Sequence, residues 1–369
     1  MSSNLTNITD DSCYGDNPAS SCVVLLTVNI CVCCVIIIFN SIVLFTSLHL
    51  IKHYIPLPHS INHVGEFYLI CNLSASDLLY GVTGLTVTVW QHVSPVTSLS
   101  TCRLQWVMGQ VPYTASLYSI LSIALDRLVF ILYGLRYPVL LSTARIKLII
   151  LAVWLISFTH AITVLAPSSY PSSSGREYQG ICVETAAFSD SYFGFCFTIC
   201  ILPMVSVVSI YPVIVAVAVR ARKRKDCLIM EMNNSSLDGE ESEIRKPVSV
   251  ELFRTISYLW KIRGVRTLSL LILAVLSCLL LWPMEDLYAL VSKDETIIDD
   301  FFAVSSFLAY ANSMLNPLLY AFGHNVFKNQ MRSLMQSRRM LELTPEENRK
   351  SSVNNRNTLN TRNVLIIKY

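Results

Sequence analysis

Charged residues are scarce in this chain. Asp, Glu, Lys and Arg make up 14% of its 369 residues, whereas 53% of the residues are hydrophobic and the mean hydropathy is +0.51. A soluble domain carries about a quarter charged residues. This scarcity excludes an ordinary soluble protein and predicts a chain that lies mostly within a membrane. We expect no nucleic-acid partner.

The signatures of catalysis and transport are also missing. The chain has no His-Glu-x-x-His run and no paired-aspartate motif at a common level, so we expect no enzyme. No internal repeat is visible, which argues against the inverted halves of many transporters. No basic n-region with an apolar core precedes the first apolar stretch, so we expect an uncleaved anchor rather than a cleaved signal peptide.

Seven long apolar stretches dominate the chain, each near the length of about 20 residues that a transmembrane helix needs. They run over Val23–Leu48, Phe67–Val93, Leu104–Leu132, Ile146–Ala166, Tyr192–Val219, Val265–Val291 and Asp299–Phe322. The predicted fold class is an all-α membrane protein, a seven-transmembrane helix bundle over residues 23–322. An N-terminal tail (1–22) precedes the bundle, and a short amphipathic eighth helix (323–336) and a disordered cytoplasmic tail (337–369) follow it.

The basic residues predict the orientation. Of the 28 Lys and Arg residues, only Arg103, Arg176 and Lys293 fall on one side of the spans. Basic residues gather on the cytoplasmic side of membrane proteins, so the N-terminus is expected outside. There Asn4 and Asn7 open glycosylation acceptor triplets. These features predict a multi-pass protein of the plasma membrane with an extracellular, glycosylated N-terminus.

Most spans contain a polar residue or a proline that is costly in a membrane. In chain order these are Asn40, Asp77, Asp126-Arg127, Trp154, Pro203, Pro283 and Asn316-Pro317-Leu318-Leu319-Tyr320. This ordered set resembles the rhodopsin-like (class A) G-protein-coupled receptors over roughly residues 23–336. The resemblance implies a receptor that turns binding of an extracellular ligand of unknown class into activation of a heterotrimeric G protein.

The alternative is a ligand-scavenging or decoy seven-helix receptor that does not couple to G proteins. The intact Asp126-Arg127 pair argues against it. Three departures from the family pattern leave room for it: Leu128, Leu281 and Arg263.

Two of the 12 cysteines, Cys102 and Cys182, stand at the outer side beyond the N-terminal tail, which itself contains Cys13 and Cys22. Cys102 lies at the outer end of the third span and Cys182 lies in the second outer loop, both in a compartment where a disulfide persists. We expect a bond between them that pins the loop across the mouth of the bundle. The alternative is two free thiols.

Asp77 lies near the middle of the second span. The resemblance implies that it coordinates a sodium ion with Ser116, Asn312, Ser313 and Asn316, whose oxygens suit a small hard cation. The alternative is a protonated aspartate that is hydrogen-bonded to the same side chains. No other cofactor is expected. Retinal is excluded because Tyr310 stands seven residues before Pro317, where a Schiff base would need lysine.

Arg127 stands at the cytoplasmic end of the third span. The resemblance implies that Asp126 holds it in the inactive state, and that it is released in the active state to contact the G protein. The other members of this activation switch are Tyr211, Asn316, Pro317 and Tyr320.

Two departures concern the sixth span. Arg263 occupies the place where many relatives carry a carboxylate that restrains the arginine, so we expect raised basal activity and a decrease in Arg263→Glu. The family's usual aromatic two residues before the kink proline is replaced by Leu281. Trp282 directly precedes Pro283 and is turned about 100° around the helix.

The ligand pocket is expected between the outer halves of the helices. Gly109 occupies the position at which aminergic relatives carry an aspartate, so a monoamine bound in the usual way is not expected. An intramembrane glutamate marks a functional site, and Glu285 lies just above the kink proline. The expected pocket comprises Gln110, Tyr113, Glu285, Tyr288, Ser306 and Tyr310.

The segment after Tyr320 has apolar residues at helical spacing, including Phe327 and Met331, which predicts an amphipathic helix on the membrane surface. No cysteine follows for lipidation, so Lys328 and Arg332 are expected to bind anionic lipid. Phosphorylation of the serines in the third loop and tail would recruit arrestin.

Overall fold

The computed structural model describes residues 20–54, 61–94, 98–133, 136–166, 188–235, 283–284, 287–288, 291, 305–318, 327–329 and 331–333. Its long helices are α1 (Ser20–Tyr54), α2 (Ile61–Val93), α3 (Leu99–Tyr133), α5 (Thr143–Ile162) and α7 (Asp190–Ser235). The short helix α4 (Tyr137–Leu140) precedes α5, the 3-10 turn η2 (Thr163–Leu165) follows it, and residues 305–318 form a further helical segment.

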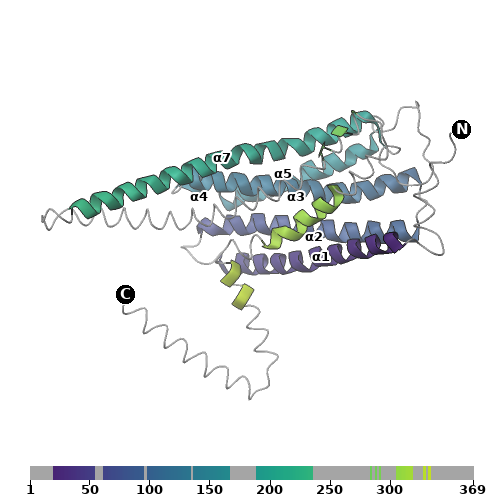
Figure 1. Cartoon of the computed structure of the whole chain (residues 1–369), viewed down its shortest axis with the longest axis horizontal. Helices are drawn as coiled ribbons and strands as arrows, with labels where there is room; N and C mark the ends of the chain where they lie inside the picture. Colours follow the sequence, from purple (N-terminus) through teal and green to yellow (C-terminus); the bar gives the residue numbers. More distant parts are fainter. Residues whose placement is uncertain are drawn as a thin grey trace, which may run out of the picture. The chain divides into compact units, whose positions relative to one another are not determined.

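The long helices lie side by side (Figure 1). α1 packs on α2, α2 packs on α3, and α3 also contacts α5 and α7. α3 is therefore the central helix. This agrees with the larger buried share of its most apolar window, 56%, against 22% in α1.

Each outer helix has a buried face and an exposed apolar face. In α1, Cys33, Ile36, Asn40 and Val43 recur at three- and four-residue spacing and are buried. Such spacing places them on one side of the helix. Phe45 is 59% exposed on the opposite side, as expected for a helix that faces lipid.

Four helices of the described part are long and apolar enough to cross a membrane: Leu26–Lys52, Leu99–Tyr133, Thr143–Leu165 and Asp190–Ile214. These agree with the first, third, fourth and fifth predicted spans. The second predicted span is helical in α2 but is not among them, since its core-facing side carries Asn72, Ser76 and Asp77, all buried. Polar groups that lower the hydropathy of α2 are thus shielded by its neighbours.

Several predictions fall outside the described residues. Most of the sixth span does, and the seventh is described only over 305–318. In the unit that begins at His324, residues 327–329 and 331–333 are helical, and the rest of the predicted amphipathic helix is outside the described part. The N-terminal tail and the C-terminal tail also lie outside it.

Candidate functional site

Asp77 joins three helical segments in the middle of the bundle. Its carboxylate is fully buried. Oδ1 accepts hydrogen bonds from Ser116 Oγ of α3 (2.7 Å) and from Ser313 Oγ of segment 305–318 (2.9 Å). Oδ2 accepts a 2.7 Å bond from Asn316 Nδ2 of the same segment. Three of the four predicted partners therefore contact Asp77, with α2, α3 and residues 305–318 each contributing, whereas Asn312 makes no hydrogen bond to the carboxylate within the described part.

Two oxygens beside this cluster have no hydrogen-bond partner in the described part of the chain. They are Oδ1 of Asn316 and Oδ1 of Asn312, and both residues are buried. An unpaired buried oxygen costs free energy, and a small cation would bind it together with the carboxylate and hydroxyl oxygens. The donor set therefore fits the predicted sodium ion.

The α1 helix is tied to the same region. Asn40 is buried and donates from Nδ2 to the carbonyl oxygen of Ser313, at 3.0 Å. Because Ser313 also donates to Asp77, α1, α2 and residues 305–318 are connected through one residue.

A second polar tie lies closer to the α3 C-terminus. Asn72 of α2 donates to Ser119 Oγ of α3 (2.7 Å) and accepts from Trp154 Nε1 of α5 (2.9 Å). The three side chains thus link three helices at one level. Removal of Asn72 would leave two partners without their bond inside the bundle.

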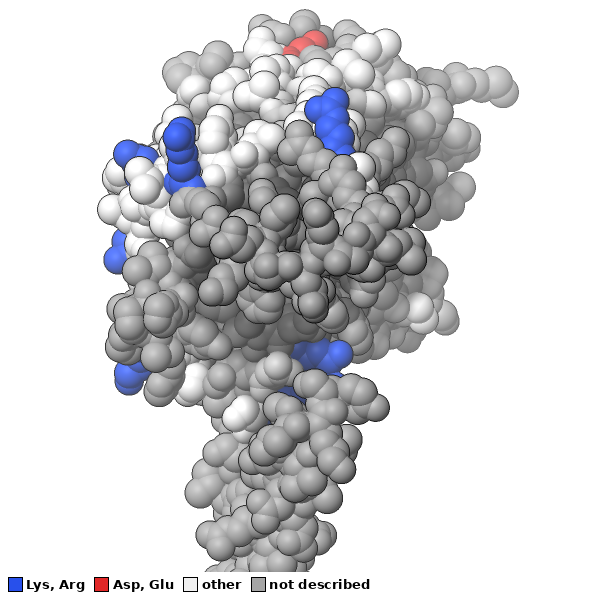
Figure 2. Space-filling model, turned by 90° about the vertical axis from the view of Figure 1, so that its left-hand side faces the viewer, with Lys and Arg blue, Asp and Glu red and all other residues white. Residues whose placement is uncertain are grey.

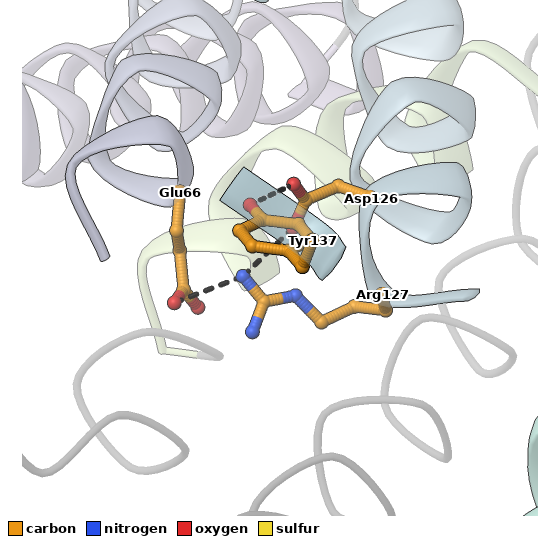
Figure 3. A network of polar contacts seen from close by, with 4 residues as sticks. All are labelled: Glu66, Asp126, Arg127 and Tyr137. Atoms are coloured by element: carbon orange, nitrogen blue, oxygen red, sulfur yellow. Dashed lines mark hydrogen bonds and ion pairs between the residues drawn. The ribbon is translucent and has the colours of Figure 1, made fainter. Parts of the chain in front are cut away.

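Arg127 lies near the C-terminus of α3, between two carboxylates (Figure 3). Its Nη2 atom is 2.9 Å from Oδ2 of Asp126 and 2.9 Å from Oε2 of Glu66. The three side chains are 12%, 2% and 6% exposed, respectively. Charge pairs with this little exposure are screened much less than surface pairs.

Tyr137 of α4 completes this network. Its hydroxyl donates a 2.6 Å hydrogen bond to Oδ1 of Asp126 (Figure 3). Burial, with the nearby Asp126 carboxylate, raises the pKa of Tyr137, so the phenol keeps its proton and remains a donor. The segment between α3 and α5 is thereby attached to the same aspartate that faces Arg127.

The end of the bundle around Arg127 is basic. Figure 2 shows blue side chains at several places on this face, and the exposed members in the described part are Lys52, Arg136, Arg145, Lys147 and Arg220. They come from α1, from the α3–α5 connection, from α5 and from α7. In the described part, α1, α5 and α7 thus each contribute an exposed cation here.

The opposite half of the bundle contains an aromatic group. The ring of Tyr310 stacks on Tyr80 of α2 with centroids 4.9 Å apart, and Tyr113 of α3 lies 6.3 Å from Tyr80. Gly84 of α2 leaves space for the Tyr310 ring, because a Cβ at position 84 would lie 2.7 Å from the Tyr310 hydroxyl. Tyr80 thus brings together two predicted pocket residues.

Other predicted pocket residues lie on the same segments. Gln110 of α3 is buried, and its Oε1 has no hydrogen-bond partner in the described part, which is also true of Ser306 Oγ. A Cβ built on Gly109 would meet no described atom within 4 Å. Among the described residues, none therefore packs against α3 at the position before Gln110. Tyr288 is described and half-buried, whereas Glu285 lies outside the described residues.

His160 of α5 links two further helices. Its Nδ1 is 2.8 Å from Thr114 Oγ1 of α3, and its Nε2 is 3.4 Å from Cys196 Sγ of α7. Its side chain is buried. The histidine therefore acts as a buried bridge in this structure.

The outer disulfide is described on one side. Cys102 is disulfide-bonded and packs in a buried cluster with Phe188 and Tyr192. Cys182 lies outside the described residues, so its pairing with Cys102 stays a prediction. Asn4, Asn7 and Tyr320 also lie outside the described residues. For Tyr211, only the helical backbone in α7 is described.

Glu66, Tyr137 and Tyr80 were missed by the sequence reasoning. Glu66 directly precedes the predicted second span, on the same side of the membrane as Arg127. A search for carboxylates at span ends on that side would have found it. No comparable signal marks Tyr137 or Tyr80, because their roles depend on how the helices pack.

Comparisons with known proteins were made over the whole chain. A family model described as "7 transmembrane receptor (rhodopsin family)" matches residues 59–320. Probable G-protein coupled receptor 21 of Homo sapiens is 25% identical over 325 residues, which are 84% of this chain and 85% of that protein.

Two other relatives are matched over less of their length. The alpha-1A adrenergic receptor of Oryzias latipes is 22% identical over 295 residues, 73% of this chain and 59% of that receptor. The adenosine receptor A2a of Canis lupus familiaris is 24% identical over 283 residues, 73% of this chain and 64% of that receptor. The match thus spans less than two thirds of both.

Proposed function

Because the chain belongs to the rhodopsin family of seven-transmembrane receptors, we propose that it converts the binding of an extracellular ligand into nucleotide exchange on a heterotrimeric G protein. The observation that carries this proposal is Arg127, which is nearly buried and ion-paired at the basic end of the bundle. A cation held in this way at the cytoplasmic end of the bundle can contact a partner protein once its carboxylates release it. The receptor itself performs no bond chemistry.

The mechanism is a shift of population between two packings of the helices. In the packing described, Arg127 pairs with Asp126, and Asp77 ties α2 to α3 and to residues 305–318. In the active packing Arg127 leaves its carboxylates and contacts the G protein, supported by Tyr211 and Tyr320. Asn316 and Pro317 lie in the seventh span, which changes its packing in the same transition.

The orientation follows from the distribution of basic residues. The basic end around Arg127 faces the cytoplasm and the N-terminus lies outside the plasma membrane, with Asn4 and Asn7 glycosylated and Cys182 bonded to Cys102. Membrane lipid surrounds the bundle and binds the basic segment after Gly323. Arrestin is a further cytoplasmic partner.

A sodium ion is part of the proposed inactive state. Asp77, Ser116, Asn312, Ser313 and Asn316 would hold it, and it would supply the positive charge that an ionised, fully buried Asp77 otherwise lacks. The hydrogen-bonded cluster and the two unpaired amide oxygens support this proposal.

The ligand is proposed to enter between Gln110, Tyr113, Tyr288, Ser306 and Tyr310, with Glu285 as its charged partner. Two of the three relatives are named for adrenergic and adenosine ligands, which differ in chemistry. Gly109 provides no carboxylate for an amine, so we do not extend the adrenergic ligand to this chain.

The Glu285→Gln variant tests the pocket. We expect a ligand found by screening to lose at least tenfold in potency, because a charged hydrogen bond contributes roughly 1.5–3 kcal/mol. The measurement is the concentration of agonist for half-maximal G-protein activation, and Asp286→Asn is the matched control. Equal potency in wild type and Glu285→Gln would remove Glu285 from the pocket.

The experiment that tests the proposed function is ligand-free G-protein activation in cells, measured across the main Gα classes. Arg127→Ala at matched surface expression is the control. Basal signal is expected because Arg263 offers no carboxylate in the sixth span, and Arg127→Ala should abolish it. If neither ligand-free nor ligand-bound receptor activates any Gα class, the scavenging or decoy receptor is the better description.

A further inference from the structure

Glu66 is a buried carboxylate for which the proposed mechanism has as yet no role. It lies in the second turn of α2, and it is 5% exposed. Its Oε2 lies 2.9 Å from Nη2 of Arg127 on α3 (Figure 3). The ion pair therefore crosses between two helices.

The contacts of Asp126 and Glu66 with Arg127 differ in whether they depend on the relative position of α2 and α3. Asp126 is the neighbour of Arg127 on the same helix, so the two residues move together when α3 moves. The Asp126 oxygen that faces Arg127 lies 2.9 Å from Nη2, so this contact is an ion pair within one helix. Glu66 belongs to another helix, and its contact breaks if α3 shifts relative to α2.

Local packing fixes the position of Glu66. The preceding residue, Gly65, lies so close to α5 that a Cβ on it would overlap Cδ1 of Ile146 and would lie 3.5 Å from the Tyr137 hydroxyl. The same hydroxyl donates to Asp126. The start of α2 is thus held against α4 and α5, with its carboxylate aimed at Arg127.

We propose that Glu66 is the interhelical restraint on Arg127 that keeps the receptor in its inactive packing. This inference rests on the proposed function. The sequence places Arg263, a cation, where a carboxylate in the sixth span would otherwise hold Arg127. α2 supplies part of the missing restraint, and activation must separate Arg127 from the start of α2.

The test is ligand-free G-protein activation by Glu66→Gln, at surface expression matched to wild type. Glutamine keeps the shape of the side chain and removes its charge. We expect the basal signal to increase roughly five- to tenfold, because breaking a largely buried ion pair has a larger effect than breaking a surface pair. Glu66→Asp keeps the charge but shortens the side chain, so an intermediate increase is expected.

Two further variants make the result specific. Arg127→Ala in the Glu66→Gln background should abolish the increase, because the signal depends on the released arginine. Arg263→Glu in the same background should return the signal towards wild type, because it supplies a carboxylate from the sixth span.

The outcomes separate this inference from the proposed function. A wild-type signal that is lost in Arg127→Ala but unchanged in Glu66→Gln and Glu66→Asp would overturn the role of Glu66 and leave receptor coupling in place. An increase that survives Arg127→Ala would also overturn it. Ligand-free silence of Glu66→Gln and Glu66→Asp would overturn the role of Glu66, whereas G-protein coupling would be overturned only if an agonist found by screening also activated no Gα class.

Discussion

Replacing Asp77 with alanine is expected to destabilise the receptor strongly. The change removes the acceptor for the hydroxyls of Ser116 and Ser313 and for the amide of Asn316, all of which are buried. Each buried donor left without a partner costs about 1–3 kcal/mol. The measurement is the thermal unfolding midpoint of the purified receptor in detergent.

The matched control is Asp77→Asn, which keeps the shape of the side chain. Its oxygen can still accept from both serines, but its new amide replaces the acceptor of Asn316 Nδ2. A half-turn of the Asn316 amide presents its unpaired Oδ1 instead, and the new amide can donate to that oxygen. We therefore expect most of the stability to return while the negative charge is lost.

The same two variants test the sodium proposal. Exchanging choline chloride for sodium chloride should raise the unfolding midpoint of wild type but of neither variant, because the carboxylate charge is needed to bind the ion. A sodium-dependent increase that persists in Asp77→Asn would place the ion elsewhere. No increase in wild type would favour the protonated, hydrogen-bonded aspartate.

Replacing Gly65 with alanine is expected to destabilise the bundle and to raise ligand-free signalling together. The new Cβ would overlap Cδ1 of Ile146, which is the end of a flexible side chain but is itself buried and has little room to turn aside. Extra atoms in a packed interior cost about 1–3 kcal/mol. The strain is relieved if the start of α2 moves away from α5, which carries Glu66 away from Arg127. The unfolding midpoint and ligand-free G-protein activation measure the two effects.

The control is the double variant with Ile146→Val. Valine lacks Cδ1, and the next atoms near the new Cβ are the Tyr137 hydroxyl at 3.5 Å and Ile146 Cγ1 at 3.8 Å, which are ordinary contacts. We expect the double variant to be close to Ile146→Val alone in both measurements. Failure of Ile146→Val to restore either one would show that Gly65 is needed for another reason.

The spans of the described part were predictable from sequence because the free energy of transfer into lipid depends mainly on local composition. Long apolar runs gave α1, α3, α5 and α7 directly. α2 was predicted as a span although its polar residues lower its hydropathy, and the structure explains this: Asn72 and Asp77 are shielded by partners on other helices.

The Asp77 cluster was also predictable, but only through the family resemblance. The local sequence does not indicate that Ser313 and Asn316, which follow Asp77 by 236 and 239 positions, contact its carboxylate. The role of Glu66 was not predictable in either way. It depends on the distance between the start of α2 and the end of α3, which is set by Gly65, Ile146 and Tyr137 rather than by any pattern within α2.

The length of α7 has a mechanical consequence. The helix has 46 residues, about 69 Å at about 1.5 Å per residue, whereas the hydrocarbon core of a bilayer is about 30 Å thick. The part beyond Ile214 therefore extends roughly 30 Å further. A tilt of about 10° at Ile214 would displace its tip by about 5 Å over this length. α7 is thus a lever arm that magnifies small rotations inside the membrane, and a probe attached near Ser235 would report them where a probe inside the bundle would not.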